Sequence, residues 1–451
     1  MLQLLRILDE KPTPDPGTEE FKLSKADKVE LKIMDNIACF LASRSTDVVT
    51  VTLHKNIPLT FVLAKNRGMP DEKDKAMAKA FFHAMRDAST WRDVMPCLIL
   101  NGAERINKAL VALTTFQFES VLDSDTPYVP GELEEEFSEN FAERFMELFG
   151  TRDPLEILKG LFHRVRERAN FEVDPTCTTN PDELNAQLEK FILVTATAES
   201  FLLTKFLRKN IDEEVDWALE YRARARQVSQ YMQGLSDLIA FRRRFILAGS
   251  DIRYVWLADI IEANSGQESE GVPNQLSDSA WTAIQRVSES LRSYESISSD
   301  EYQTHPKASG LEEQWTVTTH PIRHVVPRMI THLDRDQFYT AYPRLIGCST
   351  QLCICCARWL TEYDESGGWR RKWMASNPKG TDVEANWSLG PWEPGLSSYA
   401  NNEVYGMVFD RVTRVLKSLG LLREVKVEVS RLAEVDWGTM DIPGLLGDMW
   451  D

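Results

Sequence analysis

The chain has 451 residues, of which 43% are hydrophobic and 10% aromatic, and this length predicts two or three packed units rather than one core. Its formal net charge of −17 argues against a general nucleic-acid binder or a protein of anionic membranes, because both need a basic face. No apolar run approaches the length of a membrane span, and the apolar residues before Asp9 are too few for a signal-peptide core. We therefore expect a cytoplasmic or nuclear protein with no membrane partner.

The first predicted elements are a helix and a hairpin. Residues 24–43 carry apolar side chains at three-to-four spacing, which predicts an amphipathic helix. In "DVVTVTLHKNIPLTFVLAKN" two β-branched apolar runs flank Lys55 and Asn56, which predicts an antiparallel hairpin. Because an isolated hairpin is marginally stable, we expect residues 48–70 to join a larger sheet.

The segment after the hairpin is almost wholly helical in its pattern. Asn180 is a predicted helix cap, followed by acidic residues in the first turn. Residues 263–279 are polar and predict an exposed loop, and residues 296–314 predict a linker. The clearest periodic stretches are 73–89, 102–120, 132–149, 154–168, 182–208 and 211–248.

Strands and helices alternate after residue 315, which is typical of an α/β layer. The pattern predicts strands over 315–323, 342–349, 369–376 and 423–432, and helices over 324–334, 350–364 and 402–419.

Four of the seven cysteines fall within nine positions: Cys348, Cys353, Cys355 and Cys356. The C-x-x-C formed by Cys353 and Cys356 sets two sulfurs one turn apart at the start of a predicted helix, with Ser349 or Thr350 as candidate cap. The helix N-terminus favours the thiolate form that binds metals. In a chain without an expected export signal, clustered cysteines are more often metal ligands or reactive thiols than disulfides.

A third ligand must come from elsewhere, because the chain has no second C-x-x-C. Four histidines precede the motif: His305, His320, His324 and His332. His324 opens the helix over 324–334, so two helices on one face of a parallel strand pair would bring it to the cysteines, whereas His332 lies two turns away. Two other interpretations remain: a thioredoxin-like redox pair, or ordinary core residues without any metal.

The order of these motifs resembles the zinc-dependent deaminases of the cytidine-deaminase-like fold, which begin one helix with H-x-E and the next with C-x-x-C. The fungal branch of deaminase-like proteins is more similar still, because "HVVPRMITHL", "PRLIGCSTQLCICCARWL" and "MASNPKGTDVEANWSLGPW" follow its layout. The resemblance implies a three-layer α-β-α domain from the hairpin 48–70 and the core 315–430. A large all-helical insertion, residues 71–314, would separate the second strand from the first core helix. Residues 1–47 would be an N-terminal helical segment and residues 431–451 an acidic tail.

Carried over residue by residue, the resemblance makes His324, Cys353 and Cys356 the Zn²⁺ ligands, with water in the fourth position. Asn66, at the end of the hairpin, would contact the substrate. The glutamate that shuttles protons in these enzymes would stand at residue 326, where this chain has Val326.

The valine changes the functional expectation. General acid–base catalysis contributes about 10²–10⁴-fold, valine carries no proton, and the next acidic residue is Asp334. We therefore expect a zinc-binding but catalytically degraded deaminase-fold protein. It would act by binding a nucleobase- or nucleotide-type ligand, or a protein partner through residues 71–314. The alternative is an active zinc-dependent deaminase that hydrolyses an exocyclic C–N bond with another, unidentified general acid/base.

Overall fold

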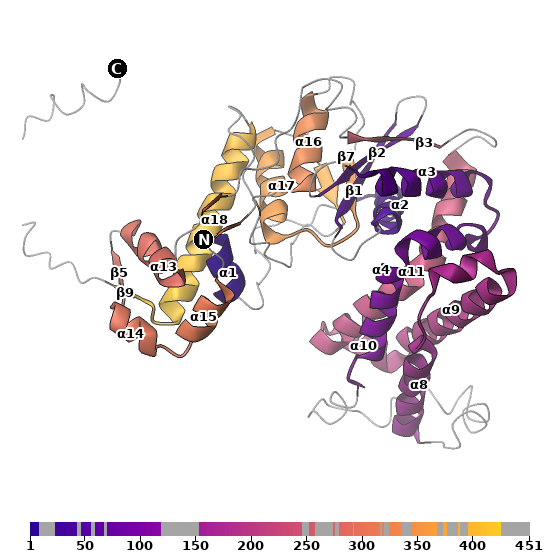
Figure 1. Ribbon diagram of the computed structural model, residues 1–451, viewed down its shortest axis with the longest axis horizontal. Helices are drawn as coiled ribbons and strands as arrows, with labels where there is room; N and C mark the ends of the chain where they lie inside the picture. Colours follow the sequence, from indigo (N-terminus) through magenta and orange to yellow (C-terminus); the bar gives the residue numbers. More distant parts are fainter. Residues whose placement is uncertain are drawn as a thin grey trace, which may run out of the picture.

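The protein is a mixed α/β structure in which a five-stranded sheet is covered by helices on both faces (Figure 1). In the described part of the chain no helix has both the length and the apolar character that crossing a membrane requires. The computed structural model describes residues 1–8, 23–42, 47–55, 59–66, 70–118, 153–245, 252–257, 274–275, 279–291, 293–315, 318–319, 324–335, 344–367, 373–376, 387 and 396–424.

The sheet has the strand order β3-β2-β1-β7-β8. Its strands are β1 (Val49–His54), β2 (Thr60–Lys65), β3 (Arg253–Trp256), β7 (Arg344–Cys348) and β8 (Trp373–Ala375). β1 and β2 form the predicted antiparallel hairpin, and β1 also pairs antiparallel with β7, with Thr50 opposite Cys348. β8 runs parallel to β7, and β3 runs parallel to β2. The expectation that the hairpin joins a larger sheet is therefore confirmed, and the strand before the cysteines is one of its neighbours.

Side chains of the central strand alternate between the two faces of the sheet. Val49 and Val51 belong to the apolar core on one face. On the other face, the Thr50 hydroxyl contacts Met329 Sδ at 3.8 Å. This period of two, together with the β-branched residues, is what makes the segment a strand.

One face of the sheet carries α2 (Lys25–Leu41) and the helices between β2 and β3. α2 lies directly on β1 and β7, and a capping box of Ser24 and Asp27 begins it. Further helices extend away from the sheet beyond α2 (Figure 1), and one apolar core joins them to it. These are α3 (Glu72–Asp87), α4 (Met95–Thr114), α8 (Pro154–Ala169), α9 (Pro181–Leu202), α10 (Lys205–Asp212) and α11 (Asp216–Phe245), with 3-10 turns at Trp91–Asp93 and Pro175–Thr179.

The helix caps of this half follow local chemistry. Asn180 caps α9 as predicted, because its side chain accepts the Asp182 N–H at 3.1 Å. The predicted helix over 182–208 is instead two helices. Thr204 interrupts it by capping α10, accepting the Leu207 N–H at 3.3 Å.

The opposite face of the sheet carries α16 (Val325–Arg335), α17 (Ile354–Gly367) and α18 (Leu396–Ser418), with a second apolar core. Shorter elements pack around α18 at the other side of the molecule (Figure 1). They are α1 (Leu2–Leu8), α13 (Ala280–Glu289), α14 (Ser299–Thr304), α15 (Ala308–Gln314), and the strand pair β5 (Tyr294–Ser296) and β9 (Leu422–Glu424).

The expectation that residues 71–314 are all helical is wrong. β3 extends the central sheet at the edge of β2, and β5 pairs with β9. β3 is only four residues long, which is too short for the alternation of apolar and polar side chains to identify a strand in the sequence.

The predicted linker over 296–314 is also wrong, because it forms α14 and α15. A capping box of Ser298 and Glu301 begins α14, and the buried Tyr302 and Leu311 anchor the pair. A few apolar side chains are enough to stabilise such short helices when they pack into a neighbouring core.

The predicted strand over 315–323 does not join the main sheet within its described residues. Only β6 (Thr318–Thr319) is present, paired with β4 (Asn274–Gln275) in a separate two-stranded sheet. Of the late predicted strand over 423–432, the structure describes only residues 423 and 424, which belong to β9, outside the main sheet. The expected helix over 132–149 and the expected acidic tail over 431–451 fall outside the described residues.

Candidate metal centre

Three predicted metal ligands converge where α16 and α17 begin. His324 directly precedes α16, Cys353 directly precedes α17, and Cys356 lies in the first turn of α17. The Nδ1 atom of His324 is 3.3 Å from the Cys353 Sγ and 3.2 Å from the Cys356 Sγ. All three residues are buried, and their ligand atoms lie within 4.8 Å of one another. The group could hold a metal ion.

Two of the ligands occupy helix-cap positions. The carbonyl of His324 accepts the Arg328 N–H at 3.2 Å, and the carbonyl of Cys353 accepts the Ala357 N–H at 2.9 Å. Two helix N-termini, each with a partial positive charge, therefore meet at the cluster. The predicted cap by Ser349 or Thr350 is wrong because α17 begins later, at Ile354.

The cysteine pair is electrostatically prepared for a cation. Burial by itself raises the pKa of the Cys353 thiol, but hydrogen bonds with Cys356 and His324 bring that pKa down to about 6. Burial and the neighbouring Cys353 raise the pKa of Cys356 well above its usual value. The indole N–H of Trp387 donates to the Cys356 Sγ at 3.4 Å. The lowered pKa of Cys353 favours its thiolate form, which is the form that binds a metal ion.

A small cavity of about 30 Å³ adjoins the cluster. It is lined by Val48, Asn66, His324, Val325, Val326, Cys348, Thr350, Gln351, Leu352, Cys353 and Cys356. No carboxylate is among these described lining residues. A space of this size accommodates one or two water molecules, whereas organic ligands usually occupy about 300–1,000 Å³.

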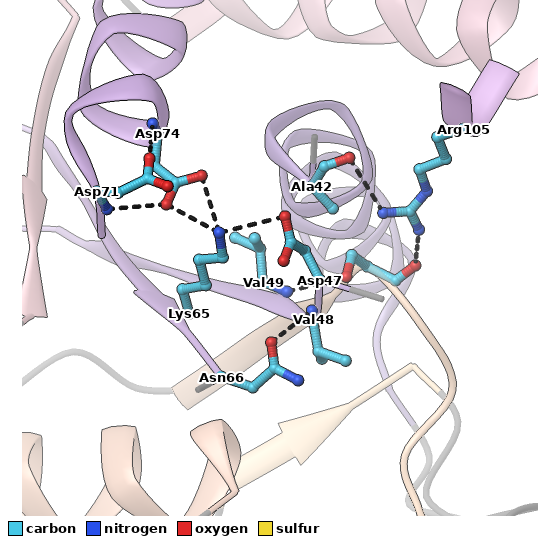
Figure 2. Close-up of polar contacts among 10 residues, drawn as sticks. Ala42, Asp47, Val48, Val49, Lys65, Asn66, Asp71, Asp74 and Arg105 are labelled. Atoms are coloured by element: carbon cyan, nitrogen blue, oxygen red, sulfur yellow. Dashed lines mark hydrogen bonds and ion pairs between the residues drawn. The ribbon is translucent and has the colours of Figure 1, made fainter. Parts of the chain in front are cut away.

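Asn66 and Val326 line this cavity together with the three ligands, so all five predicted site residues lie in one place. The Asn66 Oδ1 accepts the Val48 N–H at 2.7 Å, and the Asn66 N–H donates to the Val48 carbonyl at 2.9 Å (Figure 2). Because a backbone N–H can only donate, the bond from the Val48 N–H identifies the atom that accepts it as the amide oxygen of Asn66. The NH₂ group of Asn66 is the end that remains for the cavity.

A buried ion cluster lies on the other side of the hairpin end (Figure 2). The Lys65 Nζ is 2.8 Å from an Asp74 carboxylate oxygen and 3.2 Å from an Asp47 oxygen. All three side chains are less than a tenth exposed. This cluster joins the ends of β1 and β2 to the start of α3 and so fixes the backbone at Asn66.

Hydrogen bonds also fix the end of β7. The Val49 N–H donates to the Ser349 hydroxyl at 2.9 Å. The guanidinium of Arg105 donates to the carbonyls of Ser349 at 2.6 Å and Ala42 at 3.5 Å (Figure 2). α4 thereby holds the loop that leads to the C-x-x-C.

The other candidates do not join the site. His332 is not part of the ligand group, and the His305 Nε2 contacts the Leu419 carbonyl at 3.0 Å. His320 lies outside the described residues. Asp334, at the far end of α16, accepts the Tyr363 hydroxyl at 2.8 Å and the Trp373 indole N–H at 3.2 Å. It is a structural carboxylate and not a proton carrier for the cavity.

Two residues that the sequence did not predict to lie beside the metal ligands are at the site in the structure. Trp387 donates to Cys356 from a segment whose only signal was a tryptophan in the loop resembling that of the deaminase-like proteins. Cys348 lines the cavity, although the sequence indicates only that it ends a strand. The only indication in the sequence that Cys348 lies near the metal ligands is that it belongs to the group of four clustered cysteines.

Comparison with protein families, with curated proteins and with solved structures finds no match to this chain. The mixed α/β class and the metal-binding geometry are properties of the chain itself, and no relative's function is carried over to it.

Proposed function

We propose that this protein binds zinc through His324, Cys353 and Cys356 on a deaminase-like fold, and that it acts by binding rather than by hydrolysis. The observation that carries the proposal is the buried His324 Nδ1, 3.2 and 3.3 Å from the two sulfurs. Tetrahedral zinc with ordinary bond lengths separates such nitrogen and sulfur ligands by about 3.6 Å. A small opening of the cluster therefore admits the ion.

Ligand chemistry selects zinc among the common ions. Two thiolates and one imidazole are soft or borderline donors, whereas Mg²⁺ and Ca²⁺ require oxygen ligands. A compact tetrahedral arrangement of sulfur and nitrogen is typical of zinc sites. The lowered pKa of Cys353 supports this assignment, because metal ions bind the deprotonated sulfur.

The topology supports the deaminase resemblance. The hairpin pairs with β7, and both ligand-bearing helices, α16 and α17, pack on one face of that sheet. The ligands precede or open their helices, as H-x-E and C-x-x-C do in the deaminases.

The cavity argues against hydrolysis. Zinc in such a site lowers the pKa of a bound water, but deamination also requires a group that carries protons to the ring and to the leaving amine. Val326 is buried at the expected position and cannot do so. The described cavity walls contain no carboxylate that could replace it. The zinc would then serve to hold α16 against α17.

An active deaminase is the second candidate, and Asn66 is the observation that favours it. The NH₂ group of Asn66 shares the cavity with the three ligands, where a substrate-binding amide is expected.

Zinc content and ammonia release test the proposal together. We expect stoichiometric zinc in the purified wild type and its loss in His324→Ala. We expect no ammonia release from free bases, nucleosides or single-stranded oligonucleotides by the wild type. Val326→Glu restores the proton carrier, and we expect it to gain ammonia release only where a water molecule occupies the fourth zinc position.

The matched control is Val326→Gln, because glutamine is similar in size to glutamate but cannot shuttle protons. Full activity of the wild type would establish the second candidate instead. Absence of zinc from folded wild type, even after incubation with Zn²⁺, would contradict both.

A further inference from the structure

Cys348, the last residue of β7, points to the same side of the sheet as the three ligands. It pairs with Thr50, and directly opposite residues of antiparallel strands project to one face. The Thr50 hydroxyl contacts Met329 of α16. The thiol of Cys348 is therefore on the face that α16 covers, and Cys348 lines the cavity with His324.

The backbone around Cys348 is fixed from both sides. The Cys348 N–H donates to the Asp35 carboxylate at 2.8 Å, and the Ser349 N–H donates to the Val49 carbonyl at 2.9 Å. Arg105 holds the Ser349 carbonyl at 2.6 Å. The strand end thus stays in place while rotation about the Cα–Cβ bond moves the sulfur among its staggered positions.

The remaining cavity walls offer zinc poor alternatives. Asn66, Thr350 and Gln351 contribute only neutral oxygen or nitrogen groups, whereas protein zinc sites are built from cysteine, histidine and carboxylate. Cys355 is fully buried in the core and does not line the cavity. Cys348 is the one further thiol among the described lining residues.

We infer that Cys348 is the fourth zinc ligand, so that the site is a closed one of one histidine and three cysteines. The inference rests on the proposed zinc site of His324, Cys353 and Cys356. The Cys348 sulfur lies outside the group whose ligand atoms are within 4.8 Å, so zinc binding must draw it inward. Each thiol that binds releases one proton to solvent and leaves a Zn–S bond in its place.

A closed site has a specific functional consequence. Four protein ligands leave no position for a water molecule, and structural zinc sites are distinguished from catalytic ones in this way. A proton carrier at residue 326 would then have no zinc-bound water from which to take a proton. The zinc would join three segments: the end of β7, the start of α16 and the start of α17.

X-ray absorption at the zinc edge of the zinc-loaded full chain tests the inference by counting sulfur neighbours. We expect three sulfurs at about 2.3 Å and one nitrogen near 2.0 Å in the wild type. Cys348→Ser is expected to lose one of the three sulfurs. Cys355→Ser, next to a ligand but outside the cavity, is the matched control and should leave the count unchanged.

Two sulfurs and a light fourth neighbour in zinc-loaded wild type would overturn the assignment of Cys348 and leave the three-ligand site standing. Failure of the wild type to take up zinc would contradict the proposed function itself. The wild-type sulfur count decides the inference even when Cys348→Ser does not fold.

Discussion

The two residues at the end of β2 show how neighbouring side chains serve different purposes. Lys65 and Asn66 point to opposite sides of the strand, as successive residues do. Asn66 turns its amide to the cavity beside the cysteines, whereas Lys65 lies between the carboxylates of Asp47 and Asp74. The ion cluster thus fixes the position of Asn66, although none of its own residues lines the cavity.

Replacing Lys65 should destabilise the protein strongly. Lys65→Met removes the cation between two buried carboxylates, and breaking such a group typically costs about 3–5 kcal/mol. Lys55→Met is the control, because the Lys55 pair with Glu30 is partly exposed and such pairs contribute about 0–1 kcal/mol. Urea denaturation monitored by circular dichroism measures both. Equal losses for the two variants would show that burial adds nothing to the Lys65 cluster.

At this scale the ligands were predictable, and their partners were not. Cys353 and Cys356 are three residues apart, and the helical period alone brings them together. The place of His324 at the start of the predicted helix over 324–334 indicated the third ligand. Trp387 reaches Cys356 across a long stretch of chain, and no spacing rule connects them.

At the scale of elements, α2 and β7 approach each other closely at Gly347. A Cβ at Gly347 would lie 2.2 Å from the Met34 backbone carbon and 2.4 Å from the Asp35 backbone nitrogen. Real atoms do not approach so closely, so this glycine is what lets the helix lie on the strand. Packing between α2 and β7 therefore explains why residue 347 is a glycine.

Gly347→Ala is expected to lower stability by about 3 kcal/mol or more, because the added methyl meets helix backbone that cannot move aside. Gly406→Ala is the control. It lies within α18 with open space around its Cβ position, and alanine there should stabilise the helix by about 0.5–1 kcal/mol. Thermal denaturation compares the two. A small effect at Gly347 would mean that α2 and β7 are separated more widely than described.

Long, periodic elements were predictable, and short ones were not. α2, α9 and α11 follow from apolar spacing over many turns. β3 and α14 are too short to show a period, and neighbouring strands or buried contacts stabilise them instead.

At the scale of the whole molecule, two apolar cores lie on opposite faces of one sheet. Figure 1 shows the helices on either side of that sheet. The proposed zinc site belongs to the core of α16, α17 and α18. The helices α4, α9 and α11 belong to the other core. Loss of the metal should therefore loosen one side of the molecule before the other.

Hydrogen exchange with and without a chelator tests this asymmetry. Removing zinc is expected to speed amide exchange in α16 and the first turns of α17, because binding energy is lost there. Exchange in α4, α9 and α11 should stay unchanged. The same chelator should have no effect on Cys353→Ser. Uniform acceleration throughout the chain would show that the site stabilises the fold globally.

The sequence by itself determined the local features: the hairpin, the long helices, the C-x-x-C at a helix start and the valine at position 326. These depend on side chains a few residues apart, for which the period of a helix or strand gives the geometry. Only the tertiary structure decided that β3 joins the sheet, that Lys65 is buried between two aspartates, and that Cys348 faces the ligands. Those features depend on contacts between residues far apart in the chain, which strand pairing and core packing create.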